Sequence, residues 1–290
     1  MFKTRLISGI ILVLIALAVI VPGGNTLLLA LAMISFLGLN EFYRVFEIEK
    51  ALPGMIGYAA GIGYYVFLWL CVGRQMKEEA VFGSAFLGSL SGSEVFAGGI
   101  LLFLVLLMFA YVFGFPKWKT EQIIAAFFGL FYVEVMLSFV YLTRMLPLGK
   151  YLVWLIFLCS WGCDTCAYCV GVLFGKHKMS PKLSPKKSIE GAVGGVVGAA
   201  ALGAIYGAVI GHYVNTEVVL LGLPGSFAIL CAVGGLISMV GDLAASAIKR
   251  DHEIKDYGNL IPGHGGILDR FDSVIFTAPI VYFLAKAFLG

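Results

Sequence analysis

Reactive side chains are concentrated in one polar segment near the end of the chain, residues 241–273. Lys249, Arg250 and Lys255 can neutralise phosphate oxygens through charge-assisted hydrogen bonds. The glycine-rich stretch 262–266 is flexible enough for backbone N–H groups to close around an anion, just ahead of a helix N-terminus that favours negative charge. These residue types and their order predict a site that handles phosphates.

Carboxylates in the same segment are spaced so that they can act together. Asp269 and Asp272 are three residues apart and therefore share one face of the helix predicted to follow. Together with Asp242 or Asp256 they offer the hard oxygen ligands that Mg²⁺ prefers. The combination of cations, a glycine-rich turn and carboxylates indicates phosphoryl or nucleotidyl transfer. A merely solvated polar loop would not need this density of roles.

The elements that carry these residues are those of a membrane protein. The 290 residues are 60% hydrophobic and 13% charged, with a mean hydropathy of +0.97, which excludes an ordinary soluble domain. Because lipid offers no partners to backbone polar groups, a spanning helix needs about 20 mostly apolar residues. We predict an all-α, polytopic integral membrane protein with about nine transmembrane helices. Their approximate ranges are 5–22, 26–43, 52–72, 97–115, 122–142, 151–174, 190–211, 218–248 and 272–289. The glycine-rich segment 81–97 has two possible interpretations: an interfacial or re-entrant piece, or a tenth span.

Positive charge is distributed unevenly over the predicted loops. With the N-terminus inside, all but five of the 20 lysines and arginines fall on the cytoplasmic side. This bias predicts a cytoplasmic N-terminus, with loops 175–189 and 249–271 facing the cytoplasm. The membrane that we expect is the cell's inner (plasma) membrane. The five exceptions are Arg74, Lys77, Arg144, Lys150 and Lys286.

Three acidic residues, Glu134, Asp164 and Asp242, lie well inside predicted spans. An ionisable group there costs on the order of several kcal/mol unless it is paired, hydrated or metal-bound, so each is a functional candidate. Glu134 has no polar residues near it in the sequence, and we interpret it as a residue that snorkels or pairs with a neighbouring helix. The other two belong to polar stripes at helical spacing, for which the alternative is a structural hydrogen-bond network between helices. The stripes are Ser160, Asp164 and Tyr168, and Ser238, Asp242, Ser246 and Arg250.

Polar chemistry gathers in the second half of the chain. We predict a packing and lipid-facing region at 1–150 and a catalytic region at 151–290. In the catalytic region, 174–188 holds five lysines and two Ser-Pro turns, which favour a defined loop, and Ser188 is expected to cap the next helix. The alternative for this loop is a positive-inside flank that lies near anionic lipid.

The chain resembles the phosphatidate cytidylyltransferase family, also called CDP-diacylglycerol synthases, most specifically between about 160 and 275. The runs that carry the resemblance are Asp164-Thr165-x-Ala167-Tyr168, Phe174-Gly175-Lys176-His177, Ser184-Pro185-Lys186-Lys187-Ser188-x-Glu190-Gly191, and Ser246-x-Ile-Lys-Arg-x4-Lys-Asp-x-Gly-x2-Ile-Pro-x-His-Gly-Gly-Ile-x-Asp-Arg-Phe-Asp272. Two positions depart from the family pattern. Cys166 stands where a small residue such as glycine is usual, and Ala245 where a carboxylate is common.

The resemblance implies an all-helical membrane enzyme of phospholipid biosynthesis. Such an enzyme condenses CTP with phosphatidic acid to give CDP-diacylglycerol and pyrophosphate. It uses Mg²⁺, and whether it also binds a second cation is an open question. It forms a homodimer and is surrounded by membrane lipids. The formal net charge of +3 is modest and implies attraction to an anionic leaflet, not nucleic-acid binding.

The reaction implied by the resemblance suggests a role for each residue of these motifs. The lipid phosphate would attack the α-phosphorus of CTP in line, so no protein nucleophile is needed and catalysis is mainly positioning and charge neutralisation. The predicted catalytic residues are Asp242, Lys249, Arg250, Lys255, Asp256, His264, Asp269 and Arg270. The predicted substrate-binding residues are Asp164, Tyr168, Lys176, Lys186, Lys187, Ser246, Gly265 and Gly266. The predicted metal ligands are Asp242, Asp269 and Asp272.

Two other classes of protein share part of this pattern. Another CTP-dependent membrane lipid transferase or kinase would also need membrane acids and lysine loops, but a kinase would release CDP instead of pyrophosphate. A transporter with broken helices would explain Asp164 and Asp242, but its midplane site would not need a basic, histidine-containing cytoplasmic loop.

Overall fold

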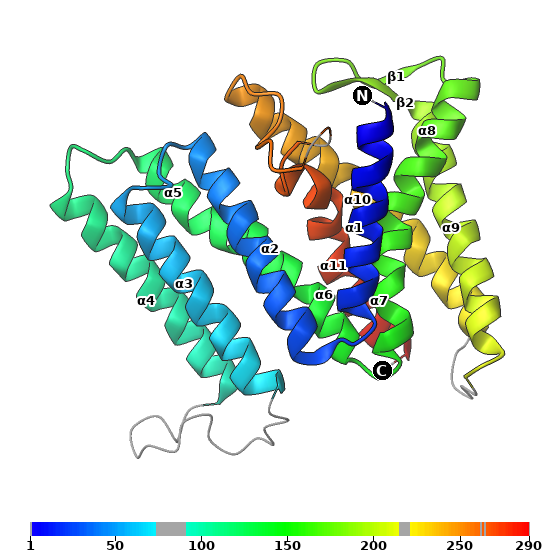
Figure 1. Ribbon diagram of the computed structural model, residues 1–290, viewed down its shortest axis with the longest axis horizontal. Helices are drawn as coiled ribbons and strands as arrows, with labels where there is room; N and C mark the ends of the chain where they lie inside the picture. Colours follow the sequence, from blue (N-terminus) through cyan, green and yellow to red (C-terminus); the bar gives the residue numbers. More distant parts are fainter. Residues whose placement is uncertain (1, 74–90, 215–220, 262, 264, 290) are drawn as a thin grey trace. The chain divides into compact units, whose positions relative to one another are not determined.

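The computed structural model describes residues 2–73, 91–214, 221–261, 263 and 265–289, which are predominantly helical (Figure 1). The α-helices are α1 (Phe2–Ile20), α2 (Gly24–Val45), α3 (Leu52–Leu68), α4 (Gly92–Phe113), α5 (Thr120–Gly129), α6 (Met136–Met145), α7 (Gly149–Phe157), α8 (Cys163–Phe174), α9 (Ile189–Gly211), α10 (Gly222–Asp251) and α11 (Leu268–Leu289). Three π-helical segments are η1 (Trp69–Gly73), η2 (Leu130–Val135) and η3 (Leu158–Gly162), and two strands are β1 (Lys178–Ser180) and β2 (Ser184–Ser188). The predicted all-α, polytopic fold is confirmed.

Eight helices in the described part of the chain are long and apolar enough to cross a membrane. Two of them are continuous through a π-helical turn: Thr120–Met145 joins α5, η2 and α6, and Gly149–Phe174 joins α7, η3 and α8. Helix α1 is not among these eight. The count of nine spans and the orientation of the N-terminus therefore stay predictions.

The glycine-rich stretch 81–97 is described only from Ser91 onward. There Ser91 and Glu94 form a capping box: the Ser91 Oγ accepts the Glu94 N–H at 3.3 Å, and the Glu94 carboxylate accepts the Ser91 N–H at 2.7 Å. Because this cap satisfies free N–H groups, α4 begins at Gly92, about five residues before the predicted start.

Two compact units make up the chain. The first holds Met1–Ser8, Phe139–Gly265 and Asp269–Gly290, and the second holds Gly9–Ser138 and Gly266–Leu268. The predicted separation of a lipid-facing region from a catalytic region concerns function and stays a prediction.

The first unit is built on the close packing of α9 against α8 and α10. A Cβ on Gly203 would lie 2.5 Å from the Phe227 carbonyl oxygen, so only a glycine lets α9 and α10 approach this closely. In the second unit, the fully buried Tyr43 of α2 donates its hydroxyl to the Ala126 carbonyl of α5 at 2.7 Å. Buried polar side chains thus gain backbone partners where lipid offers none.

The lysine-rich loop is the defined structure that its Ser-Pro turns predict. Strands β1 and β2 pair antiparallel, with Lys178 opposite Ser188. As predicted, Ser188 caps α9, because its Oγ accepts the Gly191 N–H at 3.1 Å. Glu190 accepts the Lys176 N–H at 3.0 Å, which ties the end of α8 to the start of α9.

Candidate active site

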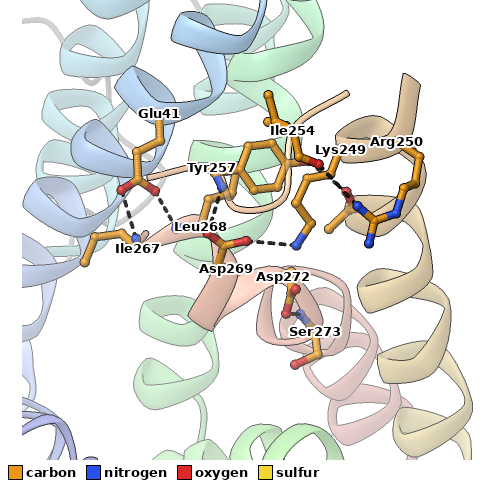
Figure 2. Close-up of polar contacts among 11 residues, drawn as sticks. Glu41, Lys249, Arg250, Ile254, Tyr257, Ile267, Leu268, Asp269, Asp272 and Ser273 are labelled. Atoms are coloured by element: carbon orange, nitrogen blue, oxygen red, sulfur yellow. Dashed lines mark hydrogen bonds and ion pairs between the residues drawn. The ribbon is translucent and has the colours of Figure 1, made fainter. Parts of the chain in front are cut away.

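Lys249 and Asp269 form a buried ion pair between α10 and α11 (Figure 2). The Lys249 Nζ lies 2.8 Å from the Asp269 Oδ1, and the two side chains are only 11% and 2% exposed. The other carboxylate oxygen, Oδ2, accepts the Tyr257 N–H at 2.8 Å. Both oxygens of Asp269 therefore hold protein groups, and the residue fixes the lysine against the loop that follows α10.

The chain reverses after α10 in a way that makes this contact possible. Glu253 adopts a left-handed backbone conformation, with φ of 55°, and the Ile254 N–H donates to the Lys249 carbonyl at 2.9 Å. This is the Schellman pattern of helix termination, which satisfies the last carbonyls. The Tyr257 hydroxyl then donates to the Ala245 carbonyl at 3.2 Å. The loop is thereby folded back along α10, and its backbone N–H reaches Asp269.

A second group of charges joins three helices of the same unit. Asp242 of α10 forms an ion pair with Lys187 of β2. Asp164 of α8 interacts electrostatically with both of them and with Arg270, and Asp272 of α11 interacts with Asp242, Asp164 and Lys249. We call Asp164, Asp242, Asp272, Lys187, Lys249 and Arg270 the charge cluster. Its combination of carboxylates and cations is suited to a substrate that carries phosphates and a metal ion.

Gly241 explains how α10 and α11 come close enough to build the charge cluster. A Cβ at this position would lie 2.8 Å from the Asp272 carbonyl oxygen and 2.9 Å from the Phe276 ring. A larger residue would push α11 away, and with it the carboxylate of Asp272. The glycine next to Asp242 is therefore a packing requirement of the site.

Arg270 has a donor that the protein does not use. Its Nε is buried and has no hydrogen-bond partner among the described residues. A buried guanidinium donor without a partner is costly, so it is a ready contact for a phosphate oxygen.

Asp242 and Asp272 fit Mg²⁺ better than Asp269 does. Within the described ranges no group of three or more His, Cys, Asp or Glu side chains is arranged to hold a metal ion, so the three predicted ligands do not gather into one site. The physical reason is that Asp269 is turned toward Lys249 and the Tyr257 N–H. Mg²⁺ commonly uses one or two carboxylates together with substrate phosphates. Asp242 and Asp272 can supply these carboxylates, and the Asp272 Oδ1 already accepts the Ser273 N–H at 2.7 Å.

The remaining predicted residues lie around the charge cluster or apart from it. Gly265 has φ of +87°, and a Cβ there would lie 3.0 Å from the Asp269 Oδ2. Both the backbone conformation and the nearby carboxylate therefore favour glycine at this position. Arg250 donates to the Ile254 carbonyl at 3.3 Å. His264 lies outside the described residues. Six of the predicted site residues have exposed side chains, and their roles stay predictions. They are Tyr168, Lys176, Lys186, Arg250, Lys255 and Asp256. Ser246 is half-buried on α10.

Glu41 is a positioning residue that sequence reasoning missed. Its carboxylate accepts the N–H groups of Ile267, at 3.0 Å, and of Leu268, at 2.9 Å, and the residue is 6% exposed (Figure 2). A Cβ on Gly266 would overlap this carboxylate, which gives Gly266 a structural reason to be glycine. A negative charge at the first turn of α11 is also favoured by the helix dipole. The signal in the sequence was an acid in the last turn of a predicted span.

Replacing Glu41 with glutamine should misplace the start of α11. One of the two N–H groups would lose its acceptor, at a cost of about 1–3 kcal/mol, because the amide offers one oxygen. Small displacements at a site lower turnover strongly, so we expect kcat to fall about tenfold or more while KM for CTP changes little. Steady-state kinetics checks this, with exposed Glu47→Gln as the control. An unchanged kcat in Glu41→Gln would remove the positioning role.

The fold is that of a polytopic membrane protein, and its charge cluster has the residue types that suit phosphate esters. The chain belongs to the cytidylyltransferase family, whose model matches residues 3–288. It is 31% identical to the phosphatidate cytidylyltransferase of Bacillus subtilis over 291 residues, which cover 99% of this chain and 98% of the relative. It is 33% identical over 300 residues to that of Haemophilus influenzae, with coverage of 98% and 97%. To the Synechocystis sp. enzyme it is 29% identical over 313 residues, with coverage of 98% and 97%. The family resemblance drawn from the motifs is confirmed.

Proposed function

We propose that the chain is a phosphatidate cytidylyltransferase, which transfers the cytidylyl group of CTP to phosphatidic acid and releases pyrophosphate. The product is CDP-diacylglycerol, a precursor in phospholipid biosynthesis. The observation that carries the proposal is the charge cluster, in which three carboxylates and three cations from α8, β2, α10 and α11 interact electrostatically and Asp242 forms an ion pair with Lys187. Full-length similarity to enzymes of this name supports the same substrates.

The reaction needs positioning more than it needs reactive protein groups. An oxygen of the lipid phosphate attacks the α-phosphorus of CTP, and the bond from that phosphorus to the bridging oxygen of pyrophosphate breaks. Lys187 and Arg270 would bind phosphate oxygens of the two substrates, and Lys249, oriented by Asp269, would stabilise the negative charge that builds up on the leaving pyrophosphate. Asp242 keeps Lys187 at the site in the absence of substrate.

Asp242 and Asp272 would hold Mg²⁺ in this scheme. When bound, Mg²⁺ neutralises charge on the phosphate oxygens of the nucleotide. The chemistry of the donor set supports the assignment, because carboxylate oxygens are hard ligands. Binding of Mn²⁺ as a paramagnetic substitute, followed by its loss in Asp272→Asn, tests the ligand role without an activity readout.

Incorporation of radiolabelled CTP into lipid is the direct test of the proposed reaction. With phosphatidic acid present, the purified chain should release one pyrophosphate for each CDP-diacylglycerol formed, and omission of phosphatidic acid should abolish both. Release of CDP would indicate a lipid kinase instead. Flux across proteoliposomes without any turnover would indicate the transporter class.

Three finer features belong to the same proposal. The charge bias of the loops supports a site that faces the cytoplasm, and the bacterial origin of the relatives supports the plasma membrane. The family resemblance supports a homodimer. Cysteine substitution in the 249–271 loop, probed with a membrane-impermeant thiol reagent on intact and broken cells, tests the orientation. Mass measurement of the detergent-solubilised protein tests the dimer.

A further inference from the structure

Glu134 is a buried acid that the proposed reaction does not use. It lies in the π-helical segment η2 and is 2% exposed. Its Oε2 has no hydrogen-bond partner among the described residues. A buried polar atom without a partner is costly in an apolar surrounding, and π-helical turns frequently mark functional sites. This residue therefore points to a ligand.

Glu134 lines a cavity in the second unit, where α2, α3 and η2 contact one another. The cavity volume is about 470 Å³, which falls in the range of small-molecule sites. One end is marked by Asn25 at the start of α2 and by Trp69, which directly follows α3. Most of the wall is hydrocarbon, from Leu28, Leu29, Ala32, Phe36, Ile62 and Val66.

The helices are shaped to hold the carboxyl group at the cavity wall. A Cβ on Gly61 of α3 would overlap the Glu134 carboxyl group, so the glycine leaves the room that this group occupies. The other deep polar group, the Tyr65 hydroxyl, is bonded to the Ser35 Oγ at 2.6 Å. The carboxyl group of Glu134 is therefore the acceptor that a ligand would meet.

Depth in the membrane limits the chemistry of that ligand. Glu134 lies near the middle of the span Thr120–Met145, where a charged lipid headgroup does not reach. Ordinary acyl chains reach it but carry no hydrogen-bond donor. An ammonium ion could donate, but pairing buried charges seldom repays their desolvation. A hydroxyl group donates without charge and matches the single acceptor.

We propose that this cavity binds a neutral membrane lipid whose polar group is a free hydroxyl, of the long-chain alcohol class. The hydroxyl donates to the Glu134 carboxyl group, and the hydrocarbon chain lies along the apolar wall between α2 and α3. The site shares no residue with the charge cluster, and the proposal gives it no part in cytidylyl transfer. Its test is therefore a binding measurement, which stands or falls independently of the proposed enzymatic activity.

Photolabelling of the full chain in lipid nanodiscs tests the site. The probe is a long-chain primary alcohol with a diazirine next to the hydroxyl, compared with matched probes in which the hydroxyl is replaced by hydrogen or by ammonium. We expect the alcohol to label peptides from 61–69 and 130–135. Removal of the hydroxyl, or the change Glu134→Leu, should weaken labelling about 3- to 10-fold, the equivalent of one hydrogen bond.

A second variant keeps the test decisive if the Glu134→Leu protein fails to fold. Ala32→Phe fills the cavity from α2 and leaves the acid intact, so it should weaken labelling at least as much as Glu134→Leu does, whereas Met33→Phe, at the exposed next position, should leave labelling unchanged. Equal labelling by the hydrogen probe would overturn the proposal in favour of a plain acyl-chain groove. Preference for the ammonium probe would overturn it in favour of a cation site. Undiminished labelling of Ala32→Phe would place the probe elsewhere.

Discussion

The change Asp242→Asn is expected to lower kcat for cytidylyl transfer by about 10²- to 10³-fold, the usual effect of losing one preorganised electrostatic group. Asparagine has nearly the same shape, so α10 should still pack against α11 at Gly241. What is lost is the negative charge that pairs with Lys187 and that we assign to Mg²⁺. Incorporation of radiolabelled CTP into lipid measures the change.

The matched control lies on the same helix. Asp251→Asn makes the identical chemical change at an exposed position at the end of α10, and its kcat should stay within about twofold of the parent, as expected for a surface substitution. If Asp242→Asn retained as much activity as Asp251→Asn, the charge cluster would not be the catalytic site. A thermal unfolding midpoint near that of the parent would exclude a folding defect as the cause of a loss.

The helices were predictable wherever a long apolar run ends at local signals. The predicted ranges 52–72 and 190–211 differ by only one residue from the helical stretch of α3 with η1 and from α9. In α9 the start is set by Ser188, a cap that local sequence reveals. Such boundaries depend on residues within one turn of the helix end, and sequence patterns contain that information.

Other boundaries depend on partners far away in the chain. Helix α11 begins at Leu268, four residues before the predicted 272, because Glu41 accepts the N–H groups of Ile267 and Leu268. The π-helical turn at η2 was also not predicted, because a one-residue change in hydrogen-bond spacing leaves the apolar pattern almost unchanged. Only the folded chain brings together residues that are more than two hundred positions apart.

In the candidate site, too, local sequence predicted some features, and others depend on residues far apart in the chain. Residue types predicted which side chains belong to one group of charges, since Asp164, Asp242, Lys249, Arg270 and Asp272 all enter the charge cluster, and their roles in the reaction stay predictions. Pairing was not predictable, because it depends on side-chain directions after packing. Asp269 holds Lys249, and Asp242 pairs with a lysine from the hairpin. Local spacing alone had grouped Asp269 with the metal ligands.

The buried pair of Lys249 and Asp269 leads to a prediction that separates stability from catalysis. Lys249→Met should lower the free energy of unfolding by about 3–5 kcal/mol, because it leaves the Asp269 carboxylate buried without its cation. It should also abolish detectable cytidylyl transfer. Thermal unfolding and CTP incorporation measure the two effects, and Lys50→Met, at an exposed loop position, is the control for loss of one lysine.

The double variant Lys249→Met/Asp269→Asn decides between a structural and a catalytic role for the lysine. Asparagine removes the buried charge but keeps an oxygen that accepts the Tyr257 N–H, so most of the lost stability should return. Activity should not return, because the phosphates still lack the Lys249 cation. Recovery of both properties would reduce Lys249 to a counter-ion of Asp269. Recovery of neither would mean that the unpaired Asp269 charge is not the cause of the lost stability. The stability of the pair depends on its neutrality, whereas catalysis depends on one of its charges, and only the double variant restores the first property without the second.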